Sequence, residues 1–263
     1  MPEISVIVTT FNRPDYLRET LKSIMNQSFT DFEIIVVDNC SEYDFFAEIK
    51  KLKDPRIKAF QNQNDGVIAL NRNFGSKKAC GQYLAFCDDD DLWHPEKLKL
   101  QYEFLSKRDE LSLLFCHSTF IDSVGKKMSN GPDIPGEYRG RAFFPLFSRG
   151  NFFPLSSSFI RQSIFAKFGG FSEDPEMITM EDYHLWLRVS FECRIDFLDR
   201  RLLYYRIHQS NQSLKLKRYL KTSIKITRDI ERRYPQIPPF LRLRKRLGIL
   251  KQISKKLIFR TPV

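Results

Sequence analysis

The sequence predicts an α/β fold in which a mainly parallel sheet is covered by helices on both faces. Short apolar runs occur at 4–9, 32–37, 57–60 and 83–87, and each is expected to be a strand. Segments with helical spacing of apolar residues alternate with these strands. Because the strands are apolar on both faces, both sides of the sheet must be buried.

The segments between and after the strands support this alternation. Leu17, Leu21, Ile24 and Met25 recur at helical spacing after the first strand. Further helices are expected at 45–52, 71–78, 163–168 and 181–191, a strand at 113–119 and a loop at 123–140. The 181–191 helix opens with two acids, which suit the positive end of a helix dipole.

The C-terminal part of the chain differs from the rest in charge. Residues 200–263 hold 19 Lys or Arg against two acids, a net charge of +17, whereas residues 1–199 sum to −6. A helix is expected at 214–233, ended by prolines at 235, 238 and 239. From Leu241 on, apolar residues recur every three or four positions with basic residues between them. This is typical of a basic amphipathic helix, and residues 241–260 are expected to bind an anionic membrane surface. The alternative is a solvated helix packed on the body by its leucines.

Composition narrows the class of protein further. The chain has 263 residues, of which 42% are hydrophobic, as in globular proteins. Its five cysteines have no zinc or redox spacing and are expected to be reduced thiols. No signal peptide opens the sequence and no run of 18 apolar residues occurs, so a cytoplasmic location, peripheral on the inner face of the plasma membrane, is expected.

Polar residues gather where the predicted strands end. Four carboxylates, Asp88 to Asp91, follow the fourth strand directly. In parallel sheets ligands bind at the carboxyl ends of strands, so residues 9–12, residues 38–39 and this aspartate cluster are expected to converge. Adjacent carboxylates repel one another, and a bound Mg²⁺ or Mn²⁺ would relieve that repulsion. The alternative is a solvated acidic turn with one aspartate as a helix cap.

Four blocks, in order, carry a family resemblance. They are SVIVTTFNRPDYLRETLKSIMNQSFTDFEIIVVDN (5–39), NRNFGSKKACGQYLAFCDDDDLWHPEKL (71–98), GGFSED with MEDYHLWLR (169–188), and YYRIHQSNQS (204–213). The sequence resembles the family 2 glycosyltransferases, which have the GT-A fold, a Rossmann-like α/β arrangement. The resemblance implies a catalytic domain at 1–213, with a nucleotide-sugar-binding half (1–98) and an acceptor half (99–213). A basic helical extension (214–263) would follow.

The resemblance also implies roles for single residues. Thr9 and Phe11 match positions that contact the base and ribose, and Phe11 replaces a frequent Tyr. Asp38 and Asn39 match the pair that reads the pyrimidine edge. Many members have Asp at the second position, so Asn39 weakens the case for uridine, although its side-chain carbonyl can still accept a hydrogen bond.

The remaining matches concern the phosphates, the metal and the acceptor. Arg72 is placed to meet the base or phosphates, and Asp88 and Asp89 match the surroundings of ribose and diphosphate. Asp90 matches the ligand of Mn²⁺ or Mg²⁺, and His208 matches a position that helps hold metal or diphosphate in some relatives. Asp182 matches the catalytic base.

Each of these assignments has a structural alternative. Phe11 could be a core aromatic, Asp182 a first-turn helix acid, and His208 an ordinary loop histidine. Trp93 and Trp186 could line an acceptor sugar site, although core packing is the favoured interpretation. Segment 140–160 holds six Phe, expected in the core or as an apolar rim for a lipid-linked acceptor.

The expected activity is inverting transfer of a sugar from a nucleotide sugar to a glycan or lipid-linked saccharide, in bacterial cell-surface polysaccharide synthesis. A UDP-sugar is the default donor, with dTDP and GDP open. A nucleotidyltransferase would show a glycine-rich phosphate loop after the first strand, which TTFNRPD is not. A nucleic-acid-binding protein is suggested by the basic tail, but no reader motif occurs and no nucleic-acid partner is expected. An inactive relative is disfavoured by Asp90 and Asp182.

Overall fold

The computed structural model describes residues 1–208 and 216–258, and of 216–217 and 250–258 it describes the backbone only. The strands of this part form one mixed sheet in the order β3-β2-β1-β4-β8-β6-β9-β5, with β7 paired to β6. Strands β1, β2, β3 and β4 are parallel, and β8 joins β4 and β6 antiparallel to both. The strands are β1 Ile4–Thr10, β2 Phe32–Asp38, β3 Ile57–Gln61, β4 Tyr83–Asp88, β5 Leu92–Trp93, β6 Leu111–Ile121, β7 Lys127–Asn130, β8 Phe159–Arg161 and β9 Arg194–Arg206.

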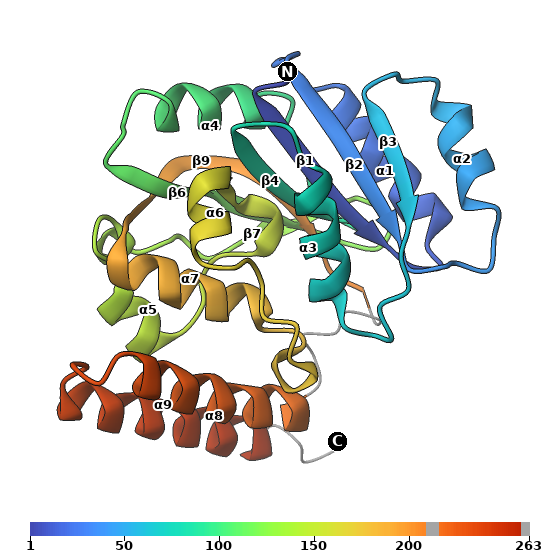
Figure 1. The fold of residues 1–263 in the computed structure, drawn as a ribbon. Helices are drawn as coiled ribbons and strands as arrows, with labels where there is room; N and C mark the ends of the chain where they lie inside the picture. The colour runs from blue at the N-terminus through green and yellow to red at the C-terminus, as the bar shows by residue number, and fades with distance from the viewer. Residues whose placement is uncertain (209–215, 259–263) are drawn as a thin grey trace.

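Helices cover both faces of this sheet (Figure 1). The helices are α1 Pro14–Met25, α2 Phe45–Leu52, α3 Ile68–Lys78, α4 Lys97–Leu105, α5 Phe143–Arg149, α6 Gln162–Lys167, α7 Glu181–Glu192, α8 Leu216–Arg233 and α9 Pro239–Ile258. Short 3-10 turns lie at Gly136–Tyr138, Leu155–Ser157 and Pro175–Met177. The predicted α/β architecture with a mainly parallel sheet is therefore confirmed.

Successive side chains of each central strand enter different cores. In β1, Ile7 packs with residues of α3, α5, α6 and α7, whereas Val6 and Val8 pack with residues of α1, α2 and α4. This alternation follows from the two-residue period of a strand. It explains why the strands read as continuous apolar runs, because neither face of the sheet meets solvent.

Helix α3 lies unusually close to the sheet. A Cβ on Gly75 would approach Ile7 Cγ2 to 2.7 Å and Val37 Cγ2 to 3.2 Å. The glycine thus allows the helix to press against β1 and β2. This contact fixes Arg72, one turn earlier in α3, over the carboxyl ends of the strands.

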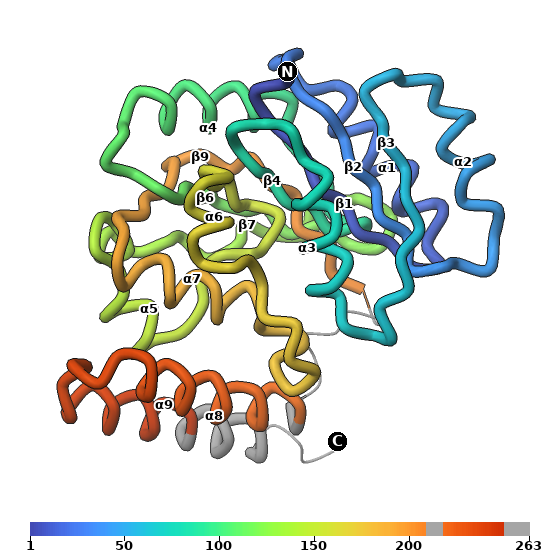
Figure 2. The backbone as a smooth tube through the Cα atoms, viewed as in Figure 1, coloured from blue at the N-terminus to red at the C-terminus, as the bar shows by residue number. Residues whose placement is uncertain are grey.

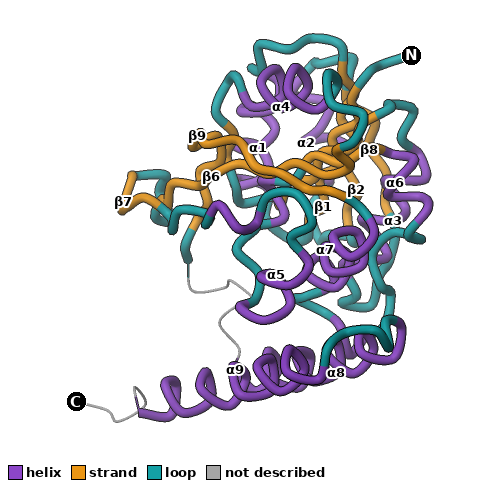
Figure 3. Tube along the Cα trace, turned by 90° about the vertical axis from the view of Figure 1, so that its left-hand side faces the viewer, coloured by secondary structure: helices purple, strands orange, loops and turns teal. Residues whose placement is uncertain are grey.

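The helices α8 and α9 form a hairpin beneath α5 and α7 (Figures 1 and 3). Ile226, Ile230, Ile237 and Leu241 belong to the same core as the α7 residues. The predicted break between the helices is confirmed, since Tyr234–Pro238 separates them. The chain trace in Figure 2 shows α9 running back alongside α8.

Helix α9 packs on the body, as the alternative expects, but Leu241 is the only one of its described leucines on the packed face. Leu241, Lys245 and Ile249, spaced four apart, are buried against the body. Phe240, Leu243 and Leu247 are exposed, with 67%, 59% and 49% of their surface accessible. The side chains from Leu250 on, which belong to the predicted stripe, lie outside the described residues. Among the helices described, none is long and apolar enough to span a bilayer.

The middle of the chain is more ordered than predicted. The expected loop at 123–140 contains β7 and a 3-10 turn, and the expected 113–119 strand extends to Leu111–Ile121. Strand β7 projects from the sheet edge in Figure 3. Its four residues are all exposed, so no burial pattern marked it in the sequence.

Candidate active site

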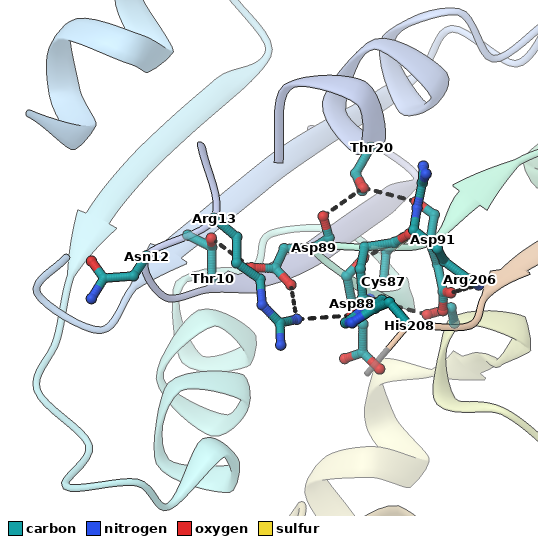
Figure 4. A network of polar contacts seen from close by, with 12 residues as sticks. Thr10, Asn12, Arg13, Thr20, Cys87, Asp88, Asp89, Asp91, Arg206 and His208 are labelled. Atoms are coloured by element: carbon teal, nitrogen blue, oxygen red, sulfur yellow. Dashed lines mark hydrogen bonds and ion pairs between the residues drawn. The ribbon is translucent and has the colours of Figure 1, made fainter. Parts of the chain in front are cut away.

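The carboxyl ends of β1, β2 and β4 meet at one edge of the sheet. In register, Thr9 lies opposite Asp88, and Thr10 lies opposite Asp38. The backbone N–H of Asn39 donates to the carbonyl oxygen of Thr10 at 3.0 Å. The predicted convergence of these three polar segments is therefore confirmed, and Figure 4 shows two of them, the end of β1 and the aspartates.

Asp89, Asp90 and Asp91 are buried and each is held by named partners, so the solvated-turn alternative is wrong. The Thr10 hydroxyl donates to Asp89 Oδ2 at 2.8 Å. Arg13 Nη1 bridges two carboxylates, at 3.2 Å from Asp89 Oδ1 and 2.8 Å from Asp90 Oδ2. The backbone N–H of Arg206 donates to Asp91 Oδ1 at 2.9 Å.

Crowding of these carboxylates favours their protonated forms. Burial, and next the charge of Asp90, raises the pKa of Asp89 to about 7, against the effect of Arg13. Burial and the charge of Asp88 raise the pKa of Asp90, and its hydrogen bond to His208 acts the other way. Burial raises the pKa of Asp91 well above its usual range. A cation bound here would lower these pKa values and so favour the ionised forms of the carboxylates.

Asp90 and His208 fit a divalent metal ion. Asp90 Oδ2 and His208 Nε2 lie 2.9 Å apart, close to the roughly 3.0 Å between neighbouring ligands about 2.1 Å from an octahedral ion. In the part of the chain that the structure describes, no group of three or more His, Cys, Asp or Glu is arranged to hold an ion alone. Mg²⁺-like ions usually take one or two carboxylates and complete their shell with substrate phosphates and water. The two side chains thus suit a metal that binds together with a diphosphate.

Arg72 connects the strand ends to the helix that carries Asp182. Its side chain is buried, with Nη2 2.6 Å from Asp88 Oδ1 and Nη1 in contact with Glu181 Oε1. The expected contact of Arg72 with base or phosphates stays a prediction, and the structure adds these two acidic partners. Glu181, which the sequence reading left without a role, is one of them.

Asp182 opens α7 beside this ion pair. Its Oδ1 accepts a hydrogen bond from the backbone N–H of Tyr183 at 2.6 Å, and its Oδ2 accepts one from Asn151 Nδ2 at 3.5 Å. Burial, followed by the charge of Glu181, raises the pKa of Asp182 to about 7, while Arg72 opposes the shift. A carboxylate with such a pKa can exchange a proton near neutral pH.

Phe11 and Thr9 remain available to a ligand. Phe11 is 49% exposed, so the core-aromatic alternative is wrong. The next residue, Asn12, has a φ of +52° and binds the β2 loop through the Glu42 N–H. The buried Thr9 hydroxyl has no hydrogen-bond partner among the described residues.

The side chains of Asp38 and Asn39, at the end of β2, already accept hydrogen bonds from nearby protein groups. Asp38 accepts hydrogen bonds from the Ser41 N–H at 2.8 Å and Gln61 Nε2 at 3.0 Å. Asn39 Oδ1 accepts from the Asn64 N–H at 2.8 Å. The carbonyl oxygen expected to read a base therefore already has one donor, and only its second lone pair is open.

The aromatic residues considered for the acceptor side are mostly core. Trp186 is fully buried against Phe115, and Trp93 is buried with its Nε1 donating to the Ser156 carbonyl at 3.0 Å. The sugar-platform interpretation of both tryptophans is wrong. Four of the six phenylalanines of 140–160 are buried, whereas Phe144 is 49% exposed.

Arg206 is a site residue that the sequence reading missed. It is fully buried at the end of β9, with Nε donating to the Asp90 carbonyl at 2.7 Å and Nη2 to Glu19 at 2.7 Å. Figure 4 shows it at the side of the aspartate cluster, near Asp91 and His208. Its position two residues before His208, in the block YYRIH, was the available signal.

Comparison with known proteins agrees with this geometry. The sequence model of "Glycosyl transferase family 2" matches residues 5–169. A glycosyltransferase of Methanocaldococcus jannaschii, MJ1057, is 30% identical over 211 residues, covering 78% of this chain and 71% of that protein. The Campylobacter jejuni GalNAc(5)-diNAcBac-PP-undecaprenol beta-1,3-glucosyltransferase is 47% identical over 95 residues, 35% of this chain and 30% of its own. The chain spans only about a third of some other relatives, such as 33% of a Rickettsia conorii glycosyltransferase.

Two groups of solved structures share the fold. Staphylococcus aureus TarS 1–349 in complex with UDP-GlcNAc superposes with a TM-score of 0.66 at 22% identity, covering 88% of this chain and 67% of that one. The Pyrobaculum calidifontis mannosyltransferase PcManGT, in complex with GDP-Man and Mn²⁺, gives 0.64 at 15% identity, covering 96% and 75%. The GT-A expectation is thus confirmed for the fold. The match of one family model to more than half of the sequence shows that the chain belongs to glycosyl transferase family 2.

Proposed function

We propose that the protein transfers a sugar from a nucleotide sugar to a saccharide hydroxyl with inversion at the anomeric carbon. The observation that carries this proposal is the bridge Asp88–Arg72–Glu181, which sets Asp182 beside the strand ends where the nucleotide would bind. Asp182 would remove the proton of the acceptor hydroxyl while that oxygen attacks the sugar from the face opposite the nucleotide. Its pKa of about 7 suits it to this role of general base.

The donor would lie along the strand ends. The exposed ring of Phe11 is available to stack on the base, and the Thr9 hydroxyl, Asp38 and Asn39 would contact base and ribose. Asp88 and Asp89 would border ribose and diphosphate, with Arg72 holding Asp88 in place. A UDP-sugar is the default donor, supported by the UDP-GlcNAc complex of TarS, although the GDP-Man complex of PcManGT keeps GDP in view.

Asp90 and His208 would hold Mn²⁺ or Mg²⁺, which when bound supplies positive charge for the leaving diphosphate. Arg13, which donates to Asp90 and Asp89, would keep these carboxylates in position. The Mn²⁺ complex of PcManGT supports manganese as the first ion to test.

Thermal melting with UDP, dTDP and GDP, each with and without Mn²⁺, tests the donor site. A ligand that binds only the folded state raises the melting temperature. A metal-dependent shift with one nucleotide is expected, and it should be lost in Asp90→Asn. The absence of any shift at millimolar ligand would contradict the donor site.

Asp182→Asn tests the base. The variant should keep the nucleotide-dependent melting shift and lose turnover, because the amide keeps the shape but cannot accept the proton. Near-normal release of nucleotide from the donor by this variant would refute the assignment.

We further propose that the acceptor is a saccharide on a lipid carrier at the inner face of a bacterial membrane, in surface-polysaccharide synthesis. The Campylobacter relative, whose name specifies an undecaprenol-linked substrate, supports this class. In α9 the exposed Phe240, Leu243 and Leu247 lie among basic residues, as required of a helix lying in an anionic interface. Residues 1–98 would then serve the donor, 99–213 the acceptor and 214–263 the membrane.

Sedimentation with vesicles tests the membrane contact. Binding to vesicles containing anionic phosphatidylglycerol is expected, with little binding to neutral phosphatidylcholine vesicles. The double variant Leu243→Glu, Leu247→Glu should lose binding and keep its melting temperature, because both leucines are exposed. Equal binding of this variant and the native chain would contradict the proposed surface.

A further inference from the structure

The first four residues of α7 are each tied to a different part of the molecule. Glu181 contacts Arg72 of α3, and Asp182 accepts from Asn151 in the loop after α5. The Tyr183 hydroxyl lies 3.0 Å from Lys245 Nζ of α9. His184 Nε2 lies 2.9 Å from Asp229 Oδ2 of α8. Two of the four ties around Asp182 therefore reach the C-terminal hairpin.

The contact of Tyr183 is part of a continuous hydrogen-bonded chain. Lys245 donates to the Tyr183 hydroxyl, and that hydroxyl donates to the carbonyl oxygen of Leu146 at 2.9 Å. Leu146 belongs to α5, which ends at Arg149, and Asn151 follows two residues later. These hydrogen bonds connect Lys245 to Asp182 in two ways. One runs through Tyr183, the next residue in the sequence, and the other runs through α5 to the segment that carries Asn151.

Lys245 is an unusual residue for this position. It is 7% exposed, and its only hydrogen-bond partner among the described side chains is the neutral Tyr183 hydroxyl. Burial lowers the pKa of Lys245 to about 8. Removing an ammonium group from water without an acidic partner opposes folding, whereas Met would fill the same space without that cost. Packing alone therefore does not account for a lysine here.

The second tie is also specific. His184 is buried in α7, and Asp229 reaches it while also pairing with Arg232 and Arg233 of its own helix. The carboxylate is thereby held in one orientation facing the α7 ring. With Tyr183 and His184 held, the backbone next to Asp182 has neighbours on two helices of the hairpin.

We propose that the α8–α9 hairpin is a working part of the active site, in which Lys245 and Asp229 are positioning residues that hold the first turn of α7 and so aim the Asp182 carboxylate. This inference rests on the proposed role of Asp182 as the base. It gives the basic C-terminal region a task inside the protein in addition to its exposed face.

Tyr183→Phe and Lys245→Met test the tie. Both preserve the packed volume and remove the hydrogen bond. Hydrogen–deuterium exchange over residues 178–186 should become about tenfold faster in each, since the amides of the first turn lose one anchor. Exchange in the strands β1 and β4 should be unchanged. Because exchange is measured on the protein alone, a result is obtained even before the acceptor is known.

Turnover provides the second readout. Release of UDP or GDP is followed with UDP-glucose, UDP-N-acetylglucosamine or GDP-mannose and Mn²⁺, water serving as the acceptor. For whichever donor is cleaved, kcat should fall roughly tenfold to a hundredfold with KM unchanged, as a misplaced base predicts. The double variant should be no worse than Tyr183→Phe alone, because that change already removes the hydrogen bond to Lys245.

Lys167→Met is the matched control. Lys167 also ties a lysine to α7, but through Glu192 at the far end of the helix, at 3.0 Å. It should leave both exchange at 178–186 and kcat unchanged. If Tyr183→Phe and Lys245→Met give native exchange and native kcat while Asp182→Asn is inactive, the positioning role is refuted and the base assignment stands. If Asp182→Asn is itself active, the proposed function fails instead. Should Lys245→Met not fold, Tyr183→Phe alone decides.

Discussion

Removing the charge of Glu181 should lower the pH at which the protein becomes active. Burial and the neighbouring Glu181 raise the pKa of Asp182 to about 7, and as the proposed base Asp182 would work only when ionised. Turnover of the native protein should therefore rise with pH and level off above about 7. In Glu181→Gln the repulsion is gone and the Arg72 cation has one acidic partner fewer, so both effects favour the ionised form of Asp182.

The size of the effect follows from these charges. With a pKa of about 7, roughly a tenth of Asp182 is ionised at pH 6. Loss of one carboxylate in the adjacent residue should lower the pKa by about one unit at the effective dielectric of a partly exposed site. About half of Asp182 would then be ionised at pH 6. The ratio of kcat at pH 6 to kcat at pH 8 should rise about fivefold.

The assay is release of nucleotide at saturating donor and Mn²⁺ between pH 5 and pH 8.5. Using kcat separates the base from changes in donor affinity that a freer Arg72 would cause. Glu192→Gln, at the other end of α7, is the control and should keep the native profile. A native profile that is flat across this range, or a midpoint that does not move in Glu181→Gln, would refute the assignment of the titration to Asp182.

Three further predictions follow from the exposure or burial of single side chains. Phe11→Ala should weaken nucleotide binding about tenfold in a titration without lowering the melting temperature, because the ring is exposed; unchanged affinity would exclude stacking. Trp186→Ala should lower the free energy of unfolding by about 3–5 kcal/mol in urea, because the indole is fully buried; a loss below about 1 kcal/mol would contradict its core position. The folded protein holds a proton on Asp89 up to about pH 7, above the usual range of an aspartate, so stability should fall as pH rises from about 4 to 7. Asp89→Asn should reduce that fall, by up to roughly 4 kcal/mol, in melts recorded with chelator; an identical pH dependence would refute the raised pKa.

The sequence was most informative where a local pattern determines the structure. Apolar runs mark the central strands, and Asp38 and Asp88 at their carboxyl ends lie at the same edge of the sheet, on either side of β1, as parallel topology requires. The α7 helix and its two initial acids were also predicted within one residue of the observed bounds. In each case the information lies within about ten neighbouring residues.

The missed contacts join residues far apart in the chain. Arg13 and Asp90 are 77 positions apart, and Arg72 and Glu181 are 109 apart. No periodicity records which cation meets which carboxylate. Helix α9 has a related feature, because Lys245 counts as polar in any pattern yet turns inward, while Leu243 and Leu247 turn outward. Hydrophobic spacing identified the helix but could not predict that a lysine would lie on its buried face.

The ion pairs of Arg72 couple the charges at the strand ends to the charges at the start of α7. Arg72 pairs with both Asp88, which in the proposed function would border the donor, and Glu181, which adjoins the proposed base Asp182. A ligand that binds Asp88 would weaken its ion pair with Arg72 and strengthen the pair between Arg72 and Glu181. The pKa of Asp182 would then change although the ligand does not contact Asp182. Binding of the donor would then change the pKa of Asp182 before the sugar is transferred.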